Sequence, residues 1–559
     1  MNKIIKKSEL QNILFSNDLK RTDILKIDSD WDCTEYNILL HRNTPFEYIG
    51  SLITKLITFY DLKINFYYSD YDDSLQLNFG RDIYDIHFIW LDYSRYNKTG
   101  TCKQILEWLK SRIISLRSKN SSRIIISDDY SGNKLSPELN YGLQNEIGSM
   151  PGVNIFCTSK IAEELGDAFL DNRFENIGAT RLSNKAIIRF AKLLGLGMIP
   201  GTIKNNLKAI VVDLDNTLYE GVLGEDGVDG IQLTDAHIKL QKILLEFYKK
   251  GIFLAISSKN KEDDVHELFN NRTDFPLTIN NFSAAAIGWY SKSEGIQKIA
   301  DKLRITPDTF LFVDDNLAEI IDVSYKYPEI NFIHNNNINT TNTMLEEGPW
   351  SFGLHDDASS QLRAKDLAAI ESRERFIENN KYNDYLSDLH TKITININNP
   401  EHLQRAIDLS NKTNQFNLSL GRIDQVDGNN WIGKDAHWII TVSLEDDLSN
   451  SGIVTSIFIY KDKDSLIIKD LCISCRALGR NLENLMIMAP IFKIAEDYKI
   501  DKIIFLYNQG PRNIPAKEWL HGILNQEVNT GANIIEIGNN LEKLSDNNHG
   551  VLINWNINE

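Results

Sequence analysis

Two aspartates separated by one residue, Asp213 and Asp215, most constrain the fold of this chain. They follow the apolar run at residues 210–212. The run predicts a buried strand, and alternate side chains of a strand share a face, so both carboxylates can meet one ligand at its end. Two such carboxylates repel each other unless a positive group lies between them. Mg²⁺ prefers oxygen ligands and bridges to phosphate, so the spacing favours a magnesium site; a strand end with an Asx turn is the structural alternative.

Three later segments favour phosphate chemistry at the same place. A second apolar run ends at the hydroxyl of Ser258, Lys292 begins a helical stretch, and a third apolar run ends in Asp314 and Asp315. In an open parallel sheet, the carboxyl ends of the strands converge on one crevice. There a metal and a lysine can neutralise phosphate charge, the hydroxyl can donate to an oxygen, and one aspartate can attack.

These four motifs, in this order, resemble those of the haloacid dehalogenase (HAD) phosphatase superfamily. The resemblance implies that Asp213 is the nucleophile and that Asp215 is the general acid and base. It implies that Ser258 and Lys292 hold the phosphoryl group. It also implies a Mg²⁺ site formed by acidic residues, namely Asp213, the backbone of Asp215, Asp314 and, in a supporting role, Asp315.

Charge and cysteine content limit the binding partners and the cellular compartment that we expect for this chain. Its 559 residues carry a net charge of −17 and show no broad basic stripe, which argues against nucleic-acid and anionic-membrane binding. No apolar run is expected to span a membrane, and residues 1–7 do not resemble a signal peptide. The five cysteines are an odd and sparse set, which predicts a cytoplasmic protein. Cys472 and Cys475 form a lone CxxC, which does not indicate a zinc site.

The N-terminal residues 1–204 predict an α/β domain with a parallel sheet, because helical patterns separate its apolar runs. Strands are expected at residues 38–40, 64–68, 86–91, 124–126 and 153–156. The order resembles the SGNH-hydrolase type of flavodoxin-like fold. Its Gly-Asp-Ser motif is absent, and residues 171–174 lack the histidine expected near the end of such a domain. We therefore expect a non-hydrolytic scaffold or docking module.

The HAD-like Rossmannoid domain is expected at residues 205–350. Its glycine-rich segment at residues 219–227 predicts either a flap over the site or an ordinary turn-rich loop. The polar residues 334–342 lack periodicity and predict a loop or linker. Residues 351–391 predict a helical connector rich in Ala, Arg, Glu and Leu.

Residues 392–559 predict an α+β domain. Antiparallel strands are expected at residues 438–444, 452–460 and 466–473, followed by a helix at 481–498 and a strand at 503–507. This order resembles the GNAT-type N-acetyltransferase fold, in which N–H groups at a strand-to-helix junction bind a pantetheine phosphate. Here Gly479 would permit close approach, and Arg476 and Arg480 would face the anion. An ordinary helix N-terminus is the alternative.

Four phrases narrow the resemblance, at residues 213–227, 258–260, 412–418 and 474–480. Together they resemble the FkbH-like family, in which a phosphatase-like domain precedes a GNAT-like domain. The resemblance implies transfer of D-glyceryl from 1,3-bisphosphoglycerate to the phosphopantetheine thiol of an acyl carrier protein, with dephosphorylation, for polyketide biosynthesis. Further substrate contacts are expected at Asn216, Thr217, Lys259 and Asn260.

The chain differs from that family at the position where members often carry a cysteine thiol. Ser257 stands where members often carry Cys, and Tyr219-Glu220 replaces Trp-Gly. Cys475 is the remaining catalytic candidate, activated by a helix N-terminus and Arg476; a buried structural cysteine is the alternative. Direct attack by the carrier thiol is another route. Two other functions stay open: a phosphatase or acyltransferase acting on another carrier-bound or cell-surface precursor, and a non-catalytic docking scaffold for a carrier protein.

Overall fold

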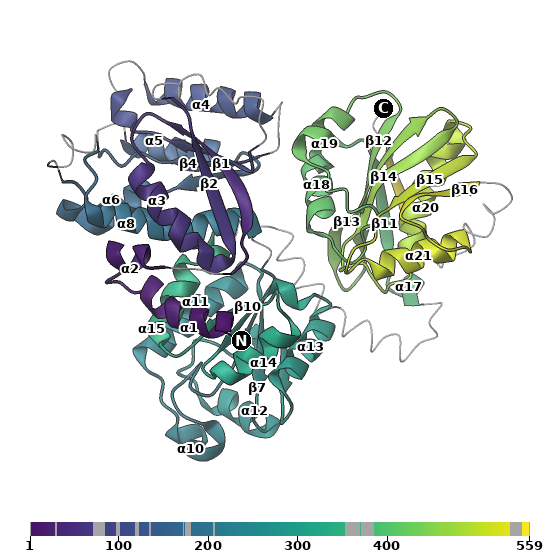
Figure 1. The fold of residues 1–559 in the computed structure, drawn as a ribbon. Coiled ribbons are helices and arrows are strands. Elements are labelled where there is room, and N and C mark those ends of the chain that lie inside the picture. The colour runs from purple at the N-terminus through teal and green to yellow at the C-terminus, as the bar shows by residue number, and fades with distance from the viewer. Residues whose placement is uncertain are drawn as a thin grey trace. The chain divides into compact units, whose positions relative to one another are not determined.

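Three sheets form from the apolar runs of the sequence, as Figure 1 shows for this computed structural model. Two five-stranded sheets lie in the first unit, residues 1–355, and a seven-stranded sheet lies in the second unit, residues 356–559. The structure describes residues 2–27, 31–70, 84–96, 101–117, 122–132, 136–171, 173, 180–204, 207–352, 369, 385–536 and 550–557.

The first sheet confirms the predicted parallel α/β fold of the N-terminal part. Its strands, all parallel to their neighbours, are β1 (Thr34–Arg42), β2 (Leu62–Tyr68), β3 (Ile86–Trp90), β4 (Arg123–Ser127) and β5 (Val153–Phe156). The order β2-β1-β3-β4-β5 is that of a flavodoxin-like doubly wound sheet. Of the predicted segment at residues 171–174, Asp171 forms an ion pair with Arg173 at 2.7 Å, and residues 172 and 174 lie outside the described residues.

One helical stretch of the described chain, Asn184–Lys204, is long and apolar enough to cross a membrane by length and composition alone. This differs from the expectation that no run reaches that length. The stretch includes α8 (Asn184–Leu193) and α9 (Ile199–Lys204), and 78% of its apolar window is buried inside the protein. Burial of that kind is typical of a core helix. Arg189 and Lys192 interrupt the apolar run, and both form ion pairs within the unit.

The second sheet positions the predicted motifs. Its strands are β6 (Ala209–Val212), β7 (Phe253–Ser258), β8 (Phe282–Ile287), β9 (Phe310–Asp314) and β10 (Asn331–His334). All pairs are parallel, in the order β10-β9-β6-β7-β8. β6, β7 and β9 are buried along their whole length, as expected for apolar runs covered on both faces. Their carboxyl ends therefore lie side by side at one edge.

The predicted loop at residues 334–342 is wrong from residue 338 onward, where α15 (Ile338–Glu347) begins. Asn337 caps this helix, because its side chain accepts from the N–H groups of two residues in the first turn. Thr341 Oγ1 donates to Asn335 Oδ1 at 2.7 Å, and Asn342 Nδ2 donates to the carbonyl of Ala236 at 3.0 Å. These tertiary hydrogen bonds hold polar residues in a helix that their lack of periodicity does not predict.

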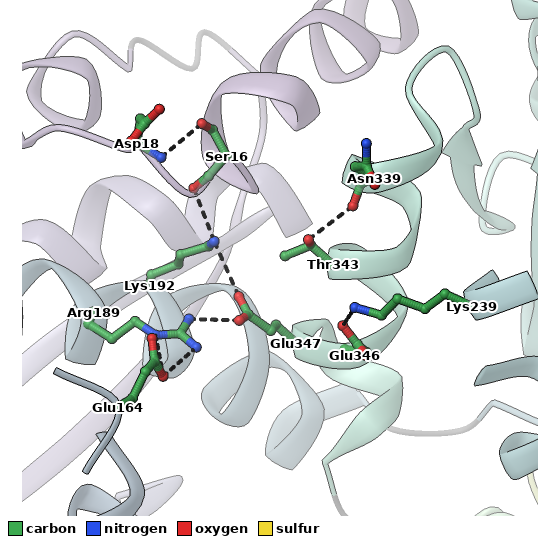
Figure 2. A network of polar contacts seen from close by, with 10 residues as sticks. All are labelled: Ser16, Asp18, Glu164, Arg189, Lys192, Lys239, Asn339, Thr343, Glu346 and Glu347. Carbon is green, nitrogen blue, oxygen red and sulfur yellow. Dashed lines mark hydrogen bonds and ion pairs between the residues drawn. The ribbon is translucent and has the colours of Figure 1, made fainter. Parts of the chain in front are cut away.

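Ion pairs join the two α/β parts of the first unit (Figure 2). The Glu347 carboxylate, at the end of α15, lies 2.7 Å from Arg189 and 3.2 Å from Lys192, both on α8. Lys192 also donates to the carbonyl of Ser16, just after α1 (Asn2–Leu14), at 3.3 Å. The helices approach closely here: a Cβ added at Gly201 would meet the Pro349 carbonyl oxygen at 2.5 Å. Residues 1–204 are thus packed directly on the part of the unit that contains the second sheet.

The second unit confirms the predicted antiparallel strands. Its sheet runs β16-β15-β14-β13-β12-β11-β17, from strands β11 (Lys392–Ile397), β12 (His437–Glu445), β13 (Asn450–Asp462), β14 (Ser465–Ile473), β15 (Lys502–Tyr507), β16 (Gly531–Glu536) and β17 (Leu552–Ile557). The predicted helix is α20 (Glu483–Asp497). Of the predicted connector at residues 351–391, residues 353–368 and 370–384 lie outside the described residues, and α17 (Tyr385–Asp388) is a short helix.

The phrase at residues 412–418 has a structural role in this unit. β14 and β15 pair in parallel only over the first residues of β14. Beyond that point, the backbone of residues 416–418 lies between the two strands. Phe416 O accepts from Ile473 N at 2.9 Å, Leu418 N donates to Leu471 O at 3.0 Å, and Leu418 O accepts from Asn508 N at 3.0 Å. The gap between the two strands is therefore filled by backbone.

Candidate active site

The register of the second sheet brings the first and last acidic motifs together. Val212 of β6 pairs with Val313 of β9, so Asp213 and Asp314 are the next residues on neighbouring strands. Carboxylate oxygens of Asp213, Asp314 and Asp315 all lie within 4.8 Å of one another. Asp314 is fully buried and Asp213 nearly so. Three of the four acidic residues expected at the metal site therefore converge through their side chains.

Lys292 lies among these carboxylates. It is the first residue of α13 (Lys292–Leu303), which is capped by the Ser291 hydroxyl. Its Nζ lies 2.7 Å from Asp213 Oδ1 and 3.0 Å from Asp314 Oδ2, and it donates to the carbonyl of Ser257. Three ionised carboxylates and one ammonium leave two negative charges in a mostly buried site. One divalent cation balances that charge, and Mg²⁺ prefers carboxylate oxygens, so these residues fit a magnesium ion.

The pKa values reflect this crowding. Burial raises the pKa of Asp314 to about 7; Lys292 opposes the rise, and Asp213 adds to it. Burial, and then Asp213, raise the pKa of Asp315 to about 6. Burial acts to lower the pKa of Lys292, but Asp213 and Asp314 outweigh burial and raise it. The carboxylates thus resist sharing one site as anions, whereas the lysine remains an ammonium.

Asp215 is held by three donors and is not part of the carboxylate cluster. Its Oδ1 accepts from the Tyr219 hydroxyl at 2.7 Å and from Leu223 N at 3.0 Å, and its Oδ2 accepts from Asn260 Nδ2 at 2.9 Å. Burial, and then Asp215 itself, raise the pKa of Tyr219, so Tyr219 stays a donor. The sequence singled out Tyr219 only as a departure from the family pattern. The expected metal contact of Asp215 through its backbone stays a prediction.

The glycine-rich segment is non-helical at residues 219–222 and helical from residue 223 onward. α10 (Leu223–Gly230) begins at the residue that donates to Asp215, and it is interrupted at Gly227, where φ is 67°. Only glycine adopts such a conformation without strain. Whether this element closes over the site stays a prediction.

The second motif is tied to the first through Asn260. Its Nδ2 donates both to Ser258 Oγ, at 3.0 Å, and to Asp215. Ser258 and Asn260 are buried next to the acidic strand ends. Lys259 forms an ion pair with Glu319 of α14 (Leu317–Lys326). Asn260 therefore supports Asp215, and Lys259 already has an anionic partner. Contacts of these two residues with substrate stay a prediction.

Asn216 stabilises the turn after β6. Its φ is 52°, and its Oδ1 accepts from Gly221 N at 3.1 Å. The side chain closes the turn in this way, and a contact of Asn216 with substrate stays a prediction. Thr217 is fully buried, and its hydroxyl has no hydrogen-bond partner among the residues that the structure describes. A contact of Thr217 with substrate stays a prediction.

Two residues at the end of β10 support the site and were not predicted. Asn335 N donates to Asp314 O at 2.8 Å, and Asn335 Nδ2 donates to Asn216 O at 3.0 Å. Asn335 thereby connects the turn after β6 to the end of β9. His334 Nε2 lies 2.9 Å from the Asp315 carbonyl. Both residues occur in a polar segment that carries no recognisable sequence signal.

At the predicted anion-binding junction of the second unit, Gly479 and Arg480 contact acidic side chains, and phosphate binding there stays a prediction. Gly479, at a φ of 76°, donates its N–H to Glu483 Oε1 at 3.0 Å. Arg480 is buried, lies 3.3 Å from Asp446 Oδ2 and donates to Ser451 Oγ at 3.0 Å. Acidic side chains of the same unit therefore occupy groups that were expected to meet a phosphate. Arg476 is buried near Ser474, and Cys475 is half-buried and forms no disulfide.

Comparisons with known proteins give distant similarities. No family model and no curated protein matches the chain. Among solved structures, one is the N-terminal part of the protein BF1531 from Bacteroides fragilis, which contains a phosphatase domain complexed with Mg. It is 18% identical with a TM-score of 0.45, over 61% of this chain and 98% of that chain. A spermidine N-acetyltransferase SpeG mutant from Vibrio cholerae is 13% identical with a TM-score of 0.21, over 27% and 98%. Neither similarity carries a functional assignment, which depends on the geometry of the site.

Proposed function

We propose that the chain is a Mg²⁺-dependent enzyme of phosphatase type that forms an aspartyl-phosphate on Asp213. The observation that carries the proposal is the convergence of Asp213, Asp314 and Asp315 within 4.8 Å, with Lys292 among them. A bound Mg²⁺ would be held by these carboxylates and would neutralise phosphate charge. Nothing in a purely structural role requires three mutually repelling carboxylates at one sheet edge.

The side chains have complementary roles in this chemistry. The Asp213 carboxylate attacks phosphorus, and the bond from phosphorus to the leaving oxygen breaks as the aspartyl-phosphate forms. The proton of the Asp215 carboxyl group passes to that oxygen, and Asp215 then takes a proton from water. The water oxygen attacks phosphorus, inorganic phosphate leaves, and both aspartates return to their starting forms. Lys292 and Ser258 offset the charge that develops on the phosphoryl oxygens.

For the substrate, we propose 1,3-bisphosphoglycerate, with an acyl carrier protein as the acceptor of the glyceryl group. The resemblance of residues 213–227, 258–260, 412–418 and 474–480 to the FkbH-like family supports this choice. An acyl phosphate is a reactive donor to a thiolate: the new carbon–sulfur bond displaces the acyl phosphate as inorganic phosphate. The remaining phosphate is an ordinary monoester that the Asp213 machinery can cleave.

A second candidate is a phosphatase acting on another phosphorylated, carrier-bound or cell-surface precursor, without acyl transfer. Ser257 favours it, because a hydroxyl stands where the family often has a thiol, and its side chain is buried. The five cysteines lie at other positions, and Cys475 belongs to the second unit. The buried cluster around Lys292 argues against a purely non-catalytic docking scaffold.

Intact-protein mass spectrometry with phosphate detection separates these candidates. The full chain would be mixed with Mg²⁺, 1,3-bisphosphoglycerate and a phosphopantetheinylated carrier protein. A glyceryl mass on the carrier supports the first candidate, and a matching mass on the enzyme that Cys475→Ala abolishes identifies a cysteine intermediate. Phosphate release without a thioester favours the second candidate.

The Asp213→Asn variant tests the mechanism common to both candidates, with Asp263→Asn as the matched control. Asp263 is a largely exposed carboxylate on α12 (Glu262–Asn271). We expect Asp213→Asn to release no phosphate and Asp263→Asn to match the unmodified chain. Full phosphate release by Asp213→Asn would contradict the aspartyl-phosphate mechanism.

A further inference from the structure

One helix of the N-terminal part contacts the end of β10, next to the acidic loop after β9. Ser8 and Gln11 lie three residues apart on α1, so they share one face of the helix. Both side chains are buried, with exposed fractions of 3% and 1%. Each of them contacts His334, the last residue of β10. Buried polar side chains normally make hydrogen bonds. Here those bonds cross to the phosphatase-like part.

Gln11 pairs with the outer edge of β10. Its Oε1 accepts from His334 N at 3.2 Å, and its Nε2 donates to His334 O. β10 is the edge strand of its sheet, and Asn335 already donates its N–H inward to Asp314. The backbone groups of His334 face outward, and the Gln11 amide satisfies both of them. The position of the strand end is therefore fixed from the side of α1.

The His334 ring connects α1 to the acidic loop. Its Nε2 lies 2.9 Å from the Asp315 carbonyl oxygen, which can only accept, so Nε2 carries the hydrogen. Its Nδ1 is then an acceptor, and the Ser8 hydroxyl donates to it. These two hydrogen bonds assign the tautomer and fix the ring orientation. Ser8, Gln11 and His334 together form the α1 latch.

We propose that Ser8 and Gln11 are positioning residues for the metal-binding loop, acting through His334 on Asp315. This inference rests on the magnesium site of the proposed function. The latch holds the backbone at Asp315, and Asn335 holds the backbone at Asp314, so the two carboxylates are presented together. The N-terminal part thus contributes to the phosphatase-like site.

The far end of α1 is fixed independently. Lys192 donates to the carbonyl of Ser16 and pairs with Glu347, as Figure 2 shows. α1 is therefore held both at the latch and at the ion-pair network. The network provides a control, because it joins the same two parts of the unit without contacting the acidic loop.

Direct metal binding tests the proposal without relying on activity. Mn²⁺ binding to the full chain would be measured by electron paramagnetic resonance, since Mn²⁺ takes the same oxygen ligands as Mg²⁺. Residues that orient metal ligands typically change metal affinity by about 10–100-fold when removed. We expect Ser8→Ala and Gln11→Leu each to weaken Mn²⁺ binding roughly tenfold. Ser8→Ala removes one hydroxyl and improves helix propensity, so it retains the fold.

Matched variants separate positioning from packing. Asn12→Ala removes an exposed contact from α1 to Asn336, and Lys192→Met breaks the distant ion pair. Both should bind Mn²⁺ like the unmodified chain, and Ser8→Thr, which keeps the hydroxyl, should retain most of the affinity. The Mg²⁺ concentration for half-maximal phosphate release should rise in Ser8→Ala, while kcat at saturating Mg²⁺ stays within a few fold.

The possible outcomes distinguish this inference from the proposed function. Unchanged Mn²⁺ binding in Ser8→Ala and Gln11→Leu, together with its loss in Asp314→Asn, would overturn only the positioning role. Equal weakening in Lys192→Met would also overturn it, because general packing of the two parts would then explain the effect. An unmodified chain that binds no Mn²⁺ would overturn the metal site itself and both proposals with it.

Discussion

The Nζ atom of Lys292 lies 2.7 Å from Oδ1 of Asp213, in a site where both side chains are almost completely buried. The two residues come from different elements, the start of α13 and the end of β6. A buried ammonium next to the proposed nucleophile orients that carboxylate, and it provides positive charge where a phosphoryl group would bind. In the proposed mechanism the ion pair is therefore a functional contact as well as a structural one.

Replacing Lys292 by methionine should lower kcat for phosphate release about 100- to 1000-fold, because a preorganised positive charge is lost from the transition state. The measurement is steady-state phosphate release at saturating Mg²⁺. Lys298→Met is the control on the same helix; Lys298 stacks on the Tyr290 ring at 3.6 Å. A Lys292→Met enzyme within threefold of the unmodified chain would exclude a direct role of the lysine.

Tyr219→Phe should slow turnover roughly tenfold, because Asp215 loses one of its three hydrogen-bond donors and is positioned less well. Both proton transfers depend on Asp215, so phosphate release is the readout, and the fraction of trapped aspartyl-phosphate shows which step is affected. Tyr325→Phe, at a residue 88% exposed, should have no effect. Equal rates for Tyr219→Phe and the unmodified chain would show that two donors suffice.

The first unit should lose stability on acidification because of His41 and His87. Their ring nitrogens lie 3.1 Å apart in the core, and burial lowers the pKa of His41 to about 4 and, with His41, that of His87 to about 3. In the unfolded chain these residues bind protons near pH 6.5. Above that pH, they therefore do not reduce the free energy of unfolding. It should fall as pH drops from 6.5 to 4, by on the order of 3 kcal/mol for His41.

Denaturant unfolding at several pH values checks this expectation. His41→Gln and His87→Gln should each reduce the dependence of unfolding free energy on pH between 6.5 and 4. His266→Gln, at an exposed residue of α12, should leave it unchanged. An unfolding free energy that is flat over this range would contradict neutral burial of the pair.

Glu347→Gln should destabilise the first unit by about 2 kcal/mol, because it leaves Arg189 and Lys192 without their shared anion in a partly buried interface (Figure 2). Thermal unfolding is the measurement. Glu346→Gln is the control: Glu346 pairs with Lys239 at 2.8 Å, but both side chains are exposed, so the change should stay below about 0.5 kcal/mol. Equal effects of the two substitutions would show that the Glu347 network adds no stability beyond a surface pair.

The strands and the four motifs could be predicted from sequence because their signals are local. The apolar runs before Asp213 and Asp314 became β6 and β9, and Lys292 became the first residue of a helix. A buried parallel strand needs a continuous apolar run, and such a run is visible without knowledge of its neighbours. The helix at residues 338–347 could not be predicted, because side-chain hydrogen bonds to the nearby Asn335 and to the distant backbone of Ala236 stabilise its polar residues.

The sequence by itself determined which residues stand at the strand ends, and hence that carboxylates, a hydroxyl and a lysine face one edge of a sheet. Only the tertiary structure decided which of them meet. Strand register placed Asp213 beside Asp314, whereas Tyr219 and Asn260 hold the Asp215 carboxylate. Contacts of this kind depend on distances between residues far apart in the chain. The same holds for Gln11 and His334, whose hydrogen bonds exist only because α1 packs against the edge of the second sheet.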